Sequence, residues 1–394
     1  MKKYCYGLLL YLLVTTAATA FAQDSSHIRI SLLTCTPGEE LYSIFGHSAI
    51  RIVDSSRISE TDPIEDLVYN YGTFNFDDEG FYLKFIQGKL LYYVSLQKFK
   101  DDNNFYGFES SYKMENRNIT EQVLDLSAQE KIAIQHRLNE NLKEENKYYK
   151  YDFFLDNCTT RLRDIIVAAK NPNPILPGVM PMNTTFRNAI HQYLDRGRQY
   201  WSKLGIDILL GAPTDAVMSS SQQQFLPDNL MNALDSTRNV PIVKTSSILY
   251  NLPQPMHHFS WFTPLVFFSS LLLLFIAISS SKNRNIQLLL TGLDGSLFFI
   301  TGILGIVLIF MMTATDHSMT KSNYNILWAL PTHAIISFFI SSKKKVVKTY
   351  FLVTAVCMAV LLLLWFFLPQ QMSYSLVPFV LLLLYRSATR YQKL

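Results

Sequence analysis

The order of apolar and polar positions divides the chain into two unlike parts. Up to residue 257 apolar residues form short runs between polar ones, whereas residues 258–394 consist mostly of long apolar runs. Because a helix needs about 20 apolar residues to cross a bilayer, the pattern predicts an all-α membrane domain of about five spans. The runs lie near residues 259–278, 286–312, 326–340, 346–368 and 373–385. The third contains Pro331, and the fifth is so short that a re-entrant or tilted path is its alternative.

The basic residues predict how this domain is oriented. They follow the first, third and fifth runs, at Lys282, Arg284, Lys343, Lys344, Lys345, Lys348, Arg386, Arg390 and Lys393. The loops on the opposite side contain only Lys321. Since cytoplasmic loops carry an excess of lysine and arginine, we expect the first set to be cytoplasmic. Residues 23–257 would then lie outside the cytoplasm.

The start of the chain predicts the same orientation. Lys2 and Lys3 precede an apolar run from Leu8 to Val14, and small residues follow, ending at Ala22. A charged start, a short apolar run and an A-x-A site are typical of a secretory signal peptide. We therefore expect residues 1–22 to be a signal peptide, with an uncleaved anchor helix as the alternative.

The first part of the chain reads as an α+β domain. Strand-type runs occur at residues 28–35, 48–53, 67–72, 90–96 and 148–155. Ser127 and Glu130 form a capping-box pattern that opens a helix of about 17 residues. These runs predict a mainly antiparallel sheet with helices to one side. Residues 170–257 are rich in Pro, Asn, Ser and Gln, and the pattern predicts no compact fold for them.

The candidate chemistry is that of an activated thiol. Cys158 follows the turn-forming pair Asp156-Asn157 and precedes a helix-like segment, so it is expected at a helix N-terminus, where the thiolate is favoured. His47 begins a strand-like run after Gly46. A cysteine and a histidine so placed are the parts of a nucleophile and its base, although each residue alone is more often structural.

The remaining parts of such a site are left open. A third polar group would orient the imidazole, and the candidates are Asn70, then Tyr71 and Glu40. Backbone N–H groups near Cys158 would donate hydrogen bonds to an oxyanion. Arg161 could assist them, or could instead contact a phosphate head group. A disulfide between Cys35 and Cys158 is the structural alternative for both thiols.

Three polar residues of the membrane part are also candidates. His317 and Asn325 fall in the loop expected on the outer side, and His333 lies within the third run. A histidine inside a span is a functional hypothesis by default, with packing and a proline kink as the plain alternative.

Composition excludes several other classes. The chain has a net charge of only +4, no Gly-rich phosphate loop and no metal-ligand spacing of histidine and acidic residues. We expect no cofactor, no metal and no nucleic-acid partner.

Long segments around these residues resemble the Lnb (DUF4105) family of Bacteroidetes. They are residues 40–51 (ELYSIFGHSAIR), 69–74 (YNYGTF) and 151–158 (YDFFLDNC), together with 325–328 (NILW), Pro331 and His333. The family is similar to permuted NlpC/P60 and lecithin:retinol acyltransferase-like papain-like enzymes, in which the histidine precedes the cysteine.

The resemblance, and not the spacing, implies a substrate. It implies a lipoprotein N-acyltransferase with Cys158 as nucleophile and His47 as base. A phospholipid would donate an acyl chain through a thioester to the α-amine of a diacylated lipoprotein. It also implies a multi-pass protein of the inner membrane with its catalytic domain in the periplasm. The rival classes are a membrane-tethered cell-wall amidase or peptidase, a phospholipase, and a non-enzymatic binding or sensing module.

Overall fold

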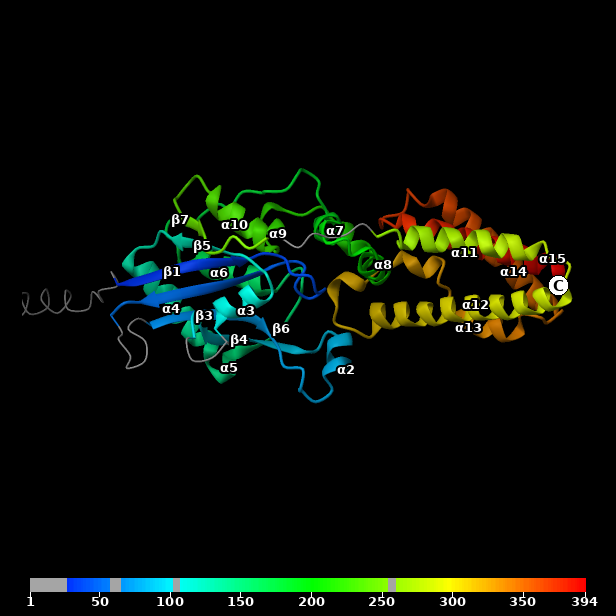
Figure 1. Ribbon diagram of the computed structural model, residues 1–394, viewed down its shortest axis with the longest axis horizontal. Helices are drawn as coiled ribbons and strands as arrows, with labels where there is room; N and C mark the ends of the chain where they lie inside the picture. The colour runs from blue at the N-terminus through cyan, green and yellow to red at the C-terminus, as the bar shows by residue number, and fades with distance from the viewer. Residues whose placement is uncertain (1–26, 57–64, 102–106, 254–259) are drawn as a thin grey trace, which may run out of the picture.

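The computed structural model describes residues 27–56, 65–101, 107–253 and 260–394. The expected signal peptide and the expected domain boundary near residue 257 lie outside these residues. The molecule is elongated, with a β-sheet toward one end and a bundle of long helices at the other (Figure 1). This is an α+β domain followed by a helical region, as the sequence pattern predicts.

One antiparallel sheet of seven strands forms the centre of the first domain, in the order β6-β4-β3-β2-β1-β5-β7. Its strands are β1 (Ile28–Cys35), β2 (His47–Asp54), β3 (Glu65–Thr73), β4 (Leu91–Lys98), β5 (Ile119–Leu124), β6 (Tyr148–Lys150) and β7 (Val243–Ile248). In the central strands, apolar side chains from both faces are buried. The sheet is therefore covered on both sides at its centre.

Helices cover the two faces unequally. The main apolar core joins the sheet to α4 (Ala128–Leu142), α6 (Cys158–Ala169) and α10 (Pro227–Asp235). The capping box at the start of α4 is present as expected. The opposite face buries a smaller cluster against α3 (Phe108–Met114). The expectation of helices on one side is thus incomplete, because Ala49 and Val68 on that face are also covered.

One expectation about local structure is wrong, and one segment to which the sequence assigned no fold is structured. The strand expected over residues 148–155 ends at Lys150, because the Asp152 carboxylate accepts the backbone N–H groups of Phe154 and Leu155 and turns the chain. Residues 170–257, for which no fold was expected, hold further helices and the edge strand β7. The helices are α7 (Phe186–Arg196), α8 (Tyr200–Leu209), α9 (Ser220–Gln223) and α10.

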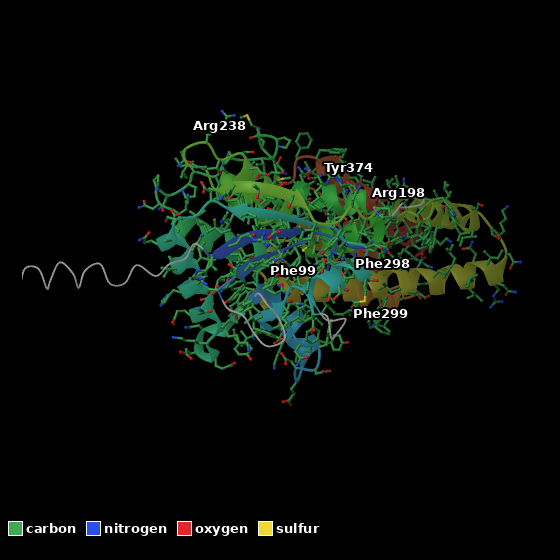
Figure 2. All side chains as sticks on the ribbon, turned by 60° about the vertical axis from the view of Figure 1, so that its left-hand side comes forward. Phe99, Arg198, Arg238, Phe298, Phe299 and Tyr374 are labelled. Atoms are coloured by element: carbon green, nitrogen blue, oxygen red, sulfur yellow. The ribbon has the colours of Figure 1, made fainter. Side chains whose placement is uncertain are left out.

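The second domain is a bundle of apolar helices. Within the described residues, α12 (Arg284–Thr313) and α14 (Lys345–Leu364) are long and apolar enough to cross a membrane. The first expected span corresponds to the shorter apolar helix α11 (Pro264–Ser279), and the fifth to α15 (Val377–Lys393). Adjacent α12 residues differ sharply in exposure: Phe298 is fully buried, whereas 39% of Phe299 is exposed (Figure 2).

The third expected span is not one continuous helix. Residues 326–340 contain the end of a 3-10 turn, the short helix α13 (Thr332–Ile336) and a second 3-10 turn. Pro331 stands at the start of α13, and proline disfavours helical backbone before it and lacks the N–H that a continuous helix requires. The sequence pattern predicted the position of this apolar segment but not the interruption of its helix.

A buried ion pair fixes α15 to α12 inside the bundle. The Arg386 guanidinium bonds both oxygens of Asp294 at 2.7 and 2.8 Å, and Arg390 adds a third bond to the same carboxylate. Both Arg386 and Asp294 are fully buried. Buried charges are tolerated when paired in this way, so the polar residues in these apolar runs have a structural role.

The two domains are bonded to each other directly. At the end of α8, the Asn323 amide donates to the carbonyls of Ile208 and Leu209 at 2.7 and 3.0 Å. The fully buried Arg187 holds this segment from the other side by pairing with Asp207 at 2.9 Å and bonding the carbonyl of Gly211. The first domain therefore rests on the ends of the membrane helices through backbone contacts.

Candidate active site

Cys158 is the first residue of helix α6, as the sequence predicts. The N-cap is Asn157, whose side-chain oxygen accepts the N–H groups of Thr159 and Thr160 at 2.8 and 2.9 Å. The Asn157 amide group also donates to the carbonyls of Phe153 and Phe225 at 2.7 and 2.9 Å. One buried side chain thus fixes the start of the helix to two neighbouring segments and locates the thiol.

His47 reaches the thiol from the first position of strand β2. The preceding Gly46 has a φ of +79°, and a Cβ there would lie 2.8 Å from the Cys35 carbonyl oxygen. Only glycine adopts this conformation without strain. The imidazole that follows is hydrogen-bonded to the Cys158 thiol and to Asn70, and it stacks on the Tyr112 ring at 6.5 Å between centroids.

Asn70 is the residue hydrogen-bonded to the far side of the imidazole. Its Oδ1 lies 2.5 Å from His47 Nε2, which leaves Nδ1 as the ring nitrogen for the thiol. The arrangement Cys–His–Asn has the parts of a papain-like triad, with the amide oxygen holding the ring. Asn70 was the first of three candidates from the sequence.

The strand register explains why the other two candidates are elsewhere. Arg51 pairs with Val68 and Ile50 with Tyr69. Because side chains alternate along a strand, Asn70 shares the face of His47, whereas Tyr71 points to the opposite face. There the buried Tyr71 hydroxyl accepts from Asn141 at 2.7 Å. Glu40 lies exposed in the loop before β2, where its backbone carbonyl accepts from the hydroxyl and the N–H of Ser43.

The surroundings of Cys158 favour the thiolate. Burial by itself would raise the pKa of the Cys158 thiol, but the charge and hydrogen bond of His47, with bonds from the Ser48 N–H and Thr159, lower it to about 7. Burial acts to lower the pKa of His47, yet the thiolate charge and the bonds to Cys158 and Asn70 raise it above its usual value. Opposite shifts in two partners favour an imidazolium–thiolate pair.

The second thiol of the domain has the opposite character. Cys35 is opposite His47 in the β1–β2 register and is fully buried. Burial raises the pKa of the Cys35 thiol to about 12. Cys35 and Cys158 are both free thiols, so the disulfide considered from the sequence is absent.

Arg161 does not serve the thiol in this structure. Its guanidinium forms two bonds of 2.7 Å with the Asp156 carboxylate and lies 3.5 Å from the centre of the Tyr149 ring. Arg161, Asp156 and Arg137 line an open cleft of about 670 Å³ between α4 and α6, and Cys158 is not among its lining residues. The side-chain contribution of Arg161 to an oxyanion site is therefore not supported.

Several contacts at the site were not foreseen from the sequence. The Ser48 hydroxyl is 3.1 Å from that of Thr159, which joins the strand of His47 to the helix of Cys158. Tyr112 is hydrogen-bonded to Cys35, and the Arg117 guanidinium lies 4.5 Å from its ring. Tyr112 lies on α3 and Arg117 in the turn that follows it, and no motif in the sequence links these two residues to His47.

The turn that leads to Cys158 is bonded to the membrane domain. The Ser318 hydroxyl donates to the Asp152 carboxylate at 2.6 Å, and Lys150 pairs with Asp316 at 2.8 Å. The loop that carries Ser318 follows directly after the end of α12. The candidate nucleophile is thus six residues away, along the chain, from a direct contact with the end of a membrane helix.

The three membrane-side candidates lie at other contacts. His317 bonds the backbone carbonyls of Phe85 and Ile86 at 3.2 and 3.1 Å. Asn325 donates to the carbonyls of Asp207 and Ile208 near the end of α8. His333 is buried in the bundle, with Nδ1 2.6 Å from the Tyr350 hydroxyl. Among the residues that the structure describes, none of the three is hydrogen-bonded to Cys158 or His47, and no group of three His, Cys, Asp or Glu could hold a metal.

Comparison with known families identifies both parts of the chain. Residues 17–192 match the Lnb N-terminal periplasmic domain, and residues 256–394 match the Lnb transmembrane domain. No curated protein and no solved structure matches the chain significantly. The two matches follow each other in one chain and together span most of it, which agrees with the expected membrane domain and periplasmic first domain. The chain is therefore a member of the Lnb family.

Proposed function

We propose that this protein is a lipoprotein N-acyltransferase of the inner membrane, acting through a thioester on Cys158. The observation that carries the proposal is the hydrogen-bonded series Cys158–His47–Asn70, bonded through its own turn to the end of a membrane helix. A thiol with a pKa of about 7 is a competent nucleophile at neutral pH. Both substrates of such a transfer are anchored in the membrane beside it.

In the first half-reaction the Cys158 thiolate attacks the carbonyl carbon of a phospholipid acyl ester. The resulting oxyanion needs N–H donors. In the first turn of α6, the N–H groups of Thr159, Thr160 and Arg161 are bonded to Asn157. The Cys158 N–H has no acceptor among the described residues, so it is the donor available to the oxyanion. Collapse breaks the ester bond, His47 protonates the departing alkoxide, and lysophospholipid leaves.

In the second half-reaction the α-amine of a diacylglyceryl-cysteine lipoprotein attacks the thioester. His47, now neutral, takes a proton from the attacking amine. The carbon–sulfur bond breaks, and the products are the N-acylated lipoprotein and the free Cys158 thiol. A covalent intermediate divides one transfer between two anchored substrates into two simpler steps.

The order of the residues supports the inferred relationship to permuted papain-like enzymes. His47 precedes Cys158 in the chain, and Asn70 lies on the strand after that of the histidine. The domain would thus hold the same group of side chains as a papain-like enzyme in a different chain order. A hydrolase would use the same residues with water as acceptor, so the reaction products distinguish these functions.

The test is mass spectrometry of lipoprotein N-terminal peptides. Cells lacking this protein are complemented with wild type, Cys158→Ala, His47→Ala or the matched control Cys357→Ser, whose thiol is exposed on α14. The wild type and Cys357→Ser should restore the N-linked acyl chain, and the other two should not. Unchanged triacylated lipoproteins in the deletion strain would refute the proposal.

A reconstituted reaction separates transfer from hydrolysis. Purified protein in phospholipid nanodiscs receives a diacylated lipopeptide, and lysophospholipid, free fatty acid and N-acyl peptide are measured. Equal amounts of lysophospholipid and N-acyl peptide support acyl transfer. Free fatty acid without N-acyl peptide would identify a phospholipase instead, and would contradict the proposed acceptor.

A further inference from the structure

The loop between β3 and β4 carries an apolar surface that the other described residues do not cover. It includes the short helix α2 (Phe81–Ile86), and its exposed side chains are Phe76, Tyr82, Leu83, Phe85 and Ile86, here called the α2 patch. Tyr82 is 76% exposed and Leu83 is 59% exposed. An apolar surface of this kind marks a site of contact with protein or membrane.

The α2 patch rests on packed aromatic side chains. Phe81 is buried beneath it, and its ring lies 5.1 Å from that of Phe76 and 6.1 Å from that of Phe85. Phe74 continues the aromatic stack to Tyr92 at 5.3 Å. The exposed side chains therefore stand on an aromatic base that holds them in position.

The membrane domain itself holds the C-terminal end of α2. The backbone N–H of Asp316 donates to the Gln87 carbonyl at 2.8 Å, and His317 bonds the carbonyls of Phe85 and Ile86. The Ile86 and Gln87 carbonyls are of the kind that a helix end leaves without an internal partner, whereas the Phe85 carbonyl also accepts from the Gly88 N–H. Asp316 and His317 lie only three and four residues after Thr313, the last residue of the membrane helix α12.

The location of α2 agrees with these bonds. Figure 1 shows α2 on the side of the sheet domain that faces the helical bundle, close to the level at which α12 ends. The exposed lysines Lys84 and Lys89 lie within and just after α2, while the acidic residues Asp77, Asp78 and Glu79 lie before it. Lysines beside apolar side chains suit a bilayer interface, where their stems are buried and their ammonium groups meet phosphates.

We propose that the α2 patch inserts into the outer leaflet of the membrane that the helical domain spans. The surface that the α2 patch contacts is the phospholipid interface beside α12, since the bonds from Asp316 and His317 fix α2 at the end of that helix. The loop that carries the patch follows the strand of Asn70, and Tyr92 at its other end stacks on Tyr151 at 4.4 Å. Lipid contact at α2 would thus bear directly on the segments around Cys158.

The test measures lipid contact and does not depend on catalysis. Leu83→Cys is labelled with an environment-sensitive fluorophore in a Cys5→Ser, Cys158→Ser, Cys357→Ser background, since the remaining Cys35 is fully buried. The full-length protein is placed in nanodiscs that hold one copy. Ile248→Cys on the far edge strand β7, with 67% exposure, is the matched control.

The label on Leu83→Cys should be quenched by lipids with a nitroxide near the head group, and protected from aqueous iodide. The label on Ile248→Cys should show the reverse. Iodide quenching at Leu83→Cys without lipid quenching would overturn the proposal, whether the patch is then open to water or awaits a protein partner. Because the background lacks the Cys158 thiol, this outcome is independent of the proposed acyl transfer.

Activity provides a second measurement. Leu83→Ser with Phe85→Ser should lower the rate of lysophospholipid release about tenfold or more, as expected when buried apolar contacts are lost, while Ile248→Ser leaves it unchanged. In nanodiscs, hydrogen exchange at α2 should be slower in the wild type than in the Leu83→Ser, Phe85→Ser protein. Equal exchange in the two proteins would also contradict the proposal.

Discussion

Removal of the His47 imidazole should return the Cys158 thiol to the behaviour of an ordinary buried cysteine. The pKa of this thiol is lowered from 9.0 to about 7, and His47 supplies the two largest of the lowering effects. The difference corresponds to about 3 kcal/mol of preference for the thiolate. In His47→Ala the remaining burial opposes ionisation, so the pKa of the Cys158 thiol should rise to about 9. If water enters the space left by the ring, the pKa should rise less, to about 8.5.

The assay is the pH dependence of Cys158 alkylation, followed on its own peptide by mass spectrometry. At pH 7 about half of the wild-type thiol is ionised, against about 1–3% in His47→Ala. A more basic thiolate is intrinsically more reactive, with a Brønsted slope of about 0.4–0.5, so the alkylation rate itself falls by only about three- to eightfold. The midpoint of the profile is therefore the sharper measure.

The matched control is His136→Ala on the outer face of α4, a histidine with 76% side-chain exposure that pairs only with Glu140. Its alkylation midpoint should stay at about 7. A midpoint near 7 in His47→Ala would refute the reasoning, because the helix N-terminus alone would then explain the low pKa. Resistance of wild-type Cys158 to alkylation at every pH would contradict the accessibility of the thiol.

The remaining predictions concern the same site and its supports. The rate of acyl-enzyme formation should fall as the pH drops below about 7, where the Cys158 thiol becomes protonated, and fall again at high pH as His47 loses the proton for the leaving group. Asn70→Ala should lower kcat/KM about 10- to 100-fold at pH 7, since a hydrogen bond to a charged group contributes about 1.5–3 kcal/mol, and Asn70→Asp should retain more activity. Asn157→Ala should destabilise the protein by about 2–5 kcal/mol in thermal unfolding, from the lost cap and two unpaired carbonyls. Arg187→Met should cost about 3–5 kcal/mol, because it removes the arginine partner of two buried carboxylates, Asp207 and Asp215.

Each of these predictions has an outcome that would contradict it. A pH profile without an acid limb near 7 would show that thiolate formation is not required at that pH. Full activity of Asn70→Ala would remove the residue from the site. Asn157→Ala or Arg187→Met with unchanged unfolding temperatures would mean that their hydrogen bonds are replaced by water or by neighbouring groups.

The sequence predicted the position of Cys158 because the signal is local. Asn157 is a favoured N-cap residue, and the segment after it has the composition of a helix, so the helix start could be read from a few neighbouring residues. The same reasoning correctly placed the start of α4 at Ser127. The lysine asymmetry likewise predicted a first domain outside the cytoplasm, in agreement with the periplasmic domain of the Lnb family.

The third member of the site could not be chosen from the sequence alone. Asn70 and Tyr71 are neighbours on one strand, so they must point to opposite faces, and only the register with β2 decides which one meets His47. The contacts of Arg161 could not be predicted from the sequence for a related reason. Its partner Asp156 lies in the turn before α6, and the pairing depends on how that turn closes.

The helices between residues 170 and 257 were missed because their stability is not local. α9 has four residues and α10 has nine, and helices of this length are marginal without tertiary contacts. Their apolar faces complete clusters that begin elsewhere, such as the packing of Leu230 and Leu234 under the sheet. Arg187, fully buried, reads in the sequence as an ordinary surface charge.

The contacts at Ser318, Asp316 and Asn323 bind the first domain to the membrane helices at more than one point. These contacts hold the Cys158 thiol at a fixed distance from the ends of the membrane helices, and under the proposed function its lipid substrates must diffuse to it. Encounters then depend on the number of molecules per area of leaflet and not on their concentration in the periplasm. Under the proposed function, the position of the first domain also selects among acceptor lipoproteins by their shape. A lipoprotein whose folded part begins directly after its lipidated cysteine would collide with the domain, whereas one with an extended tether could present its amine.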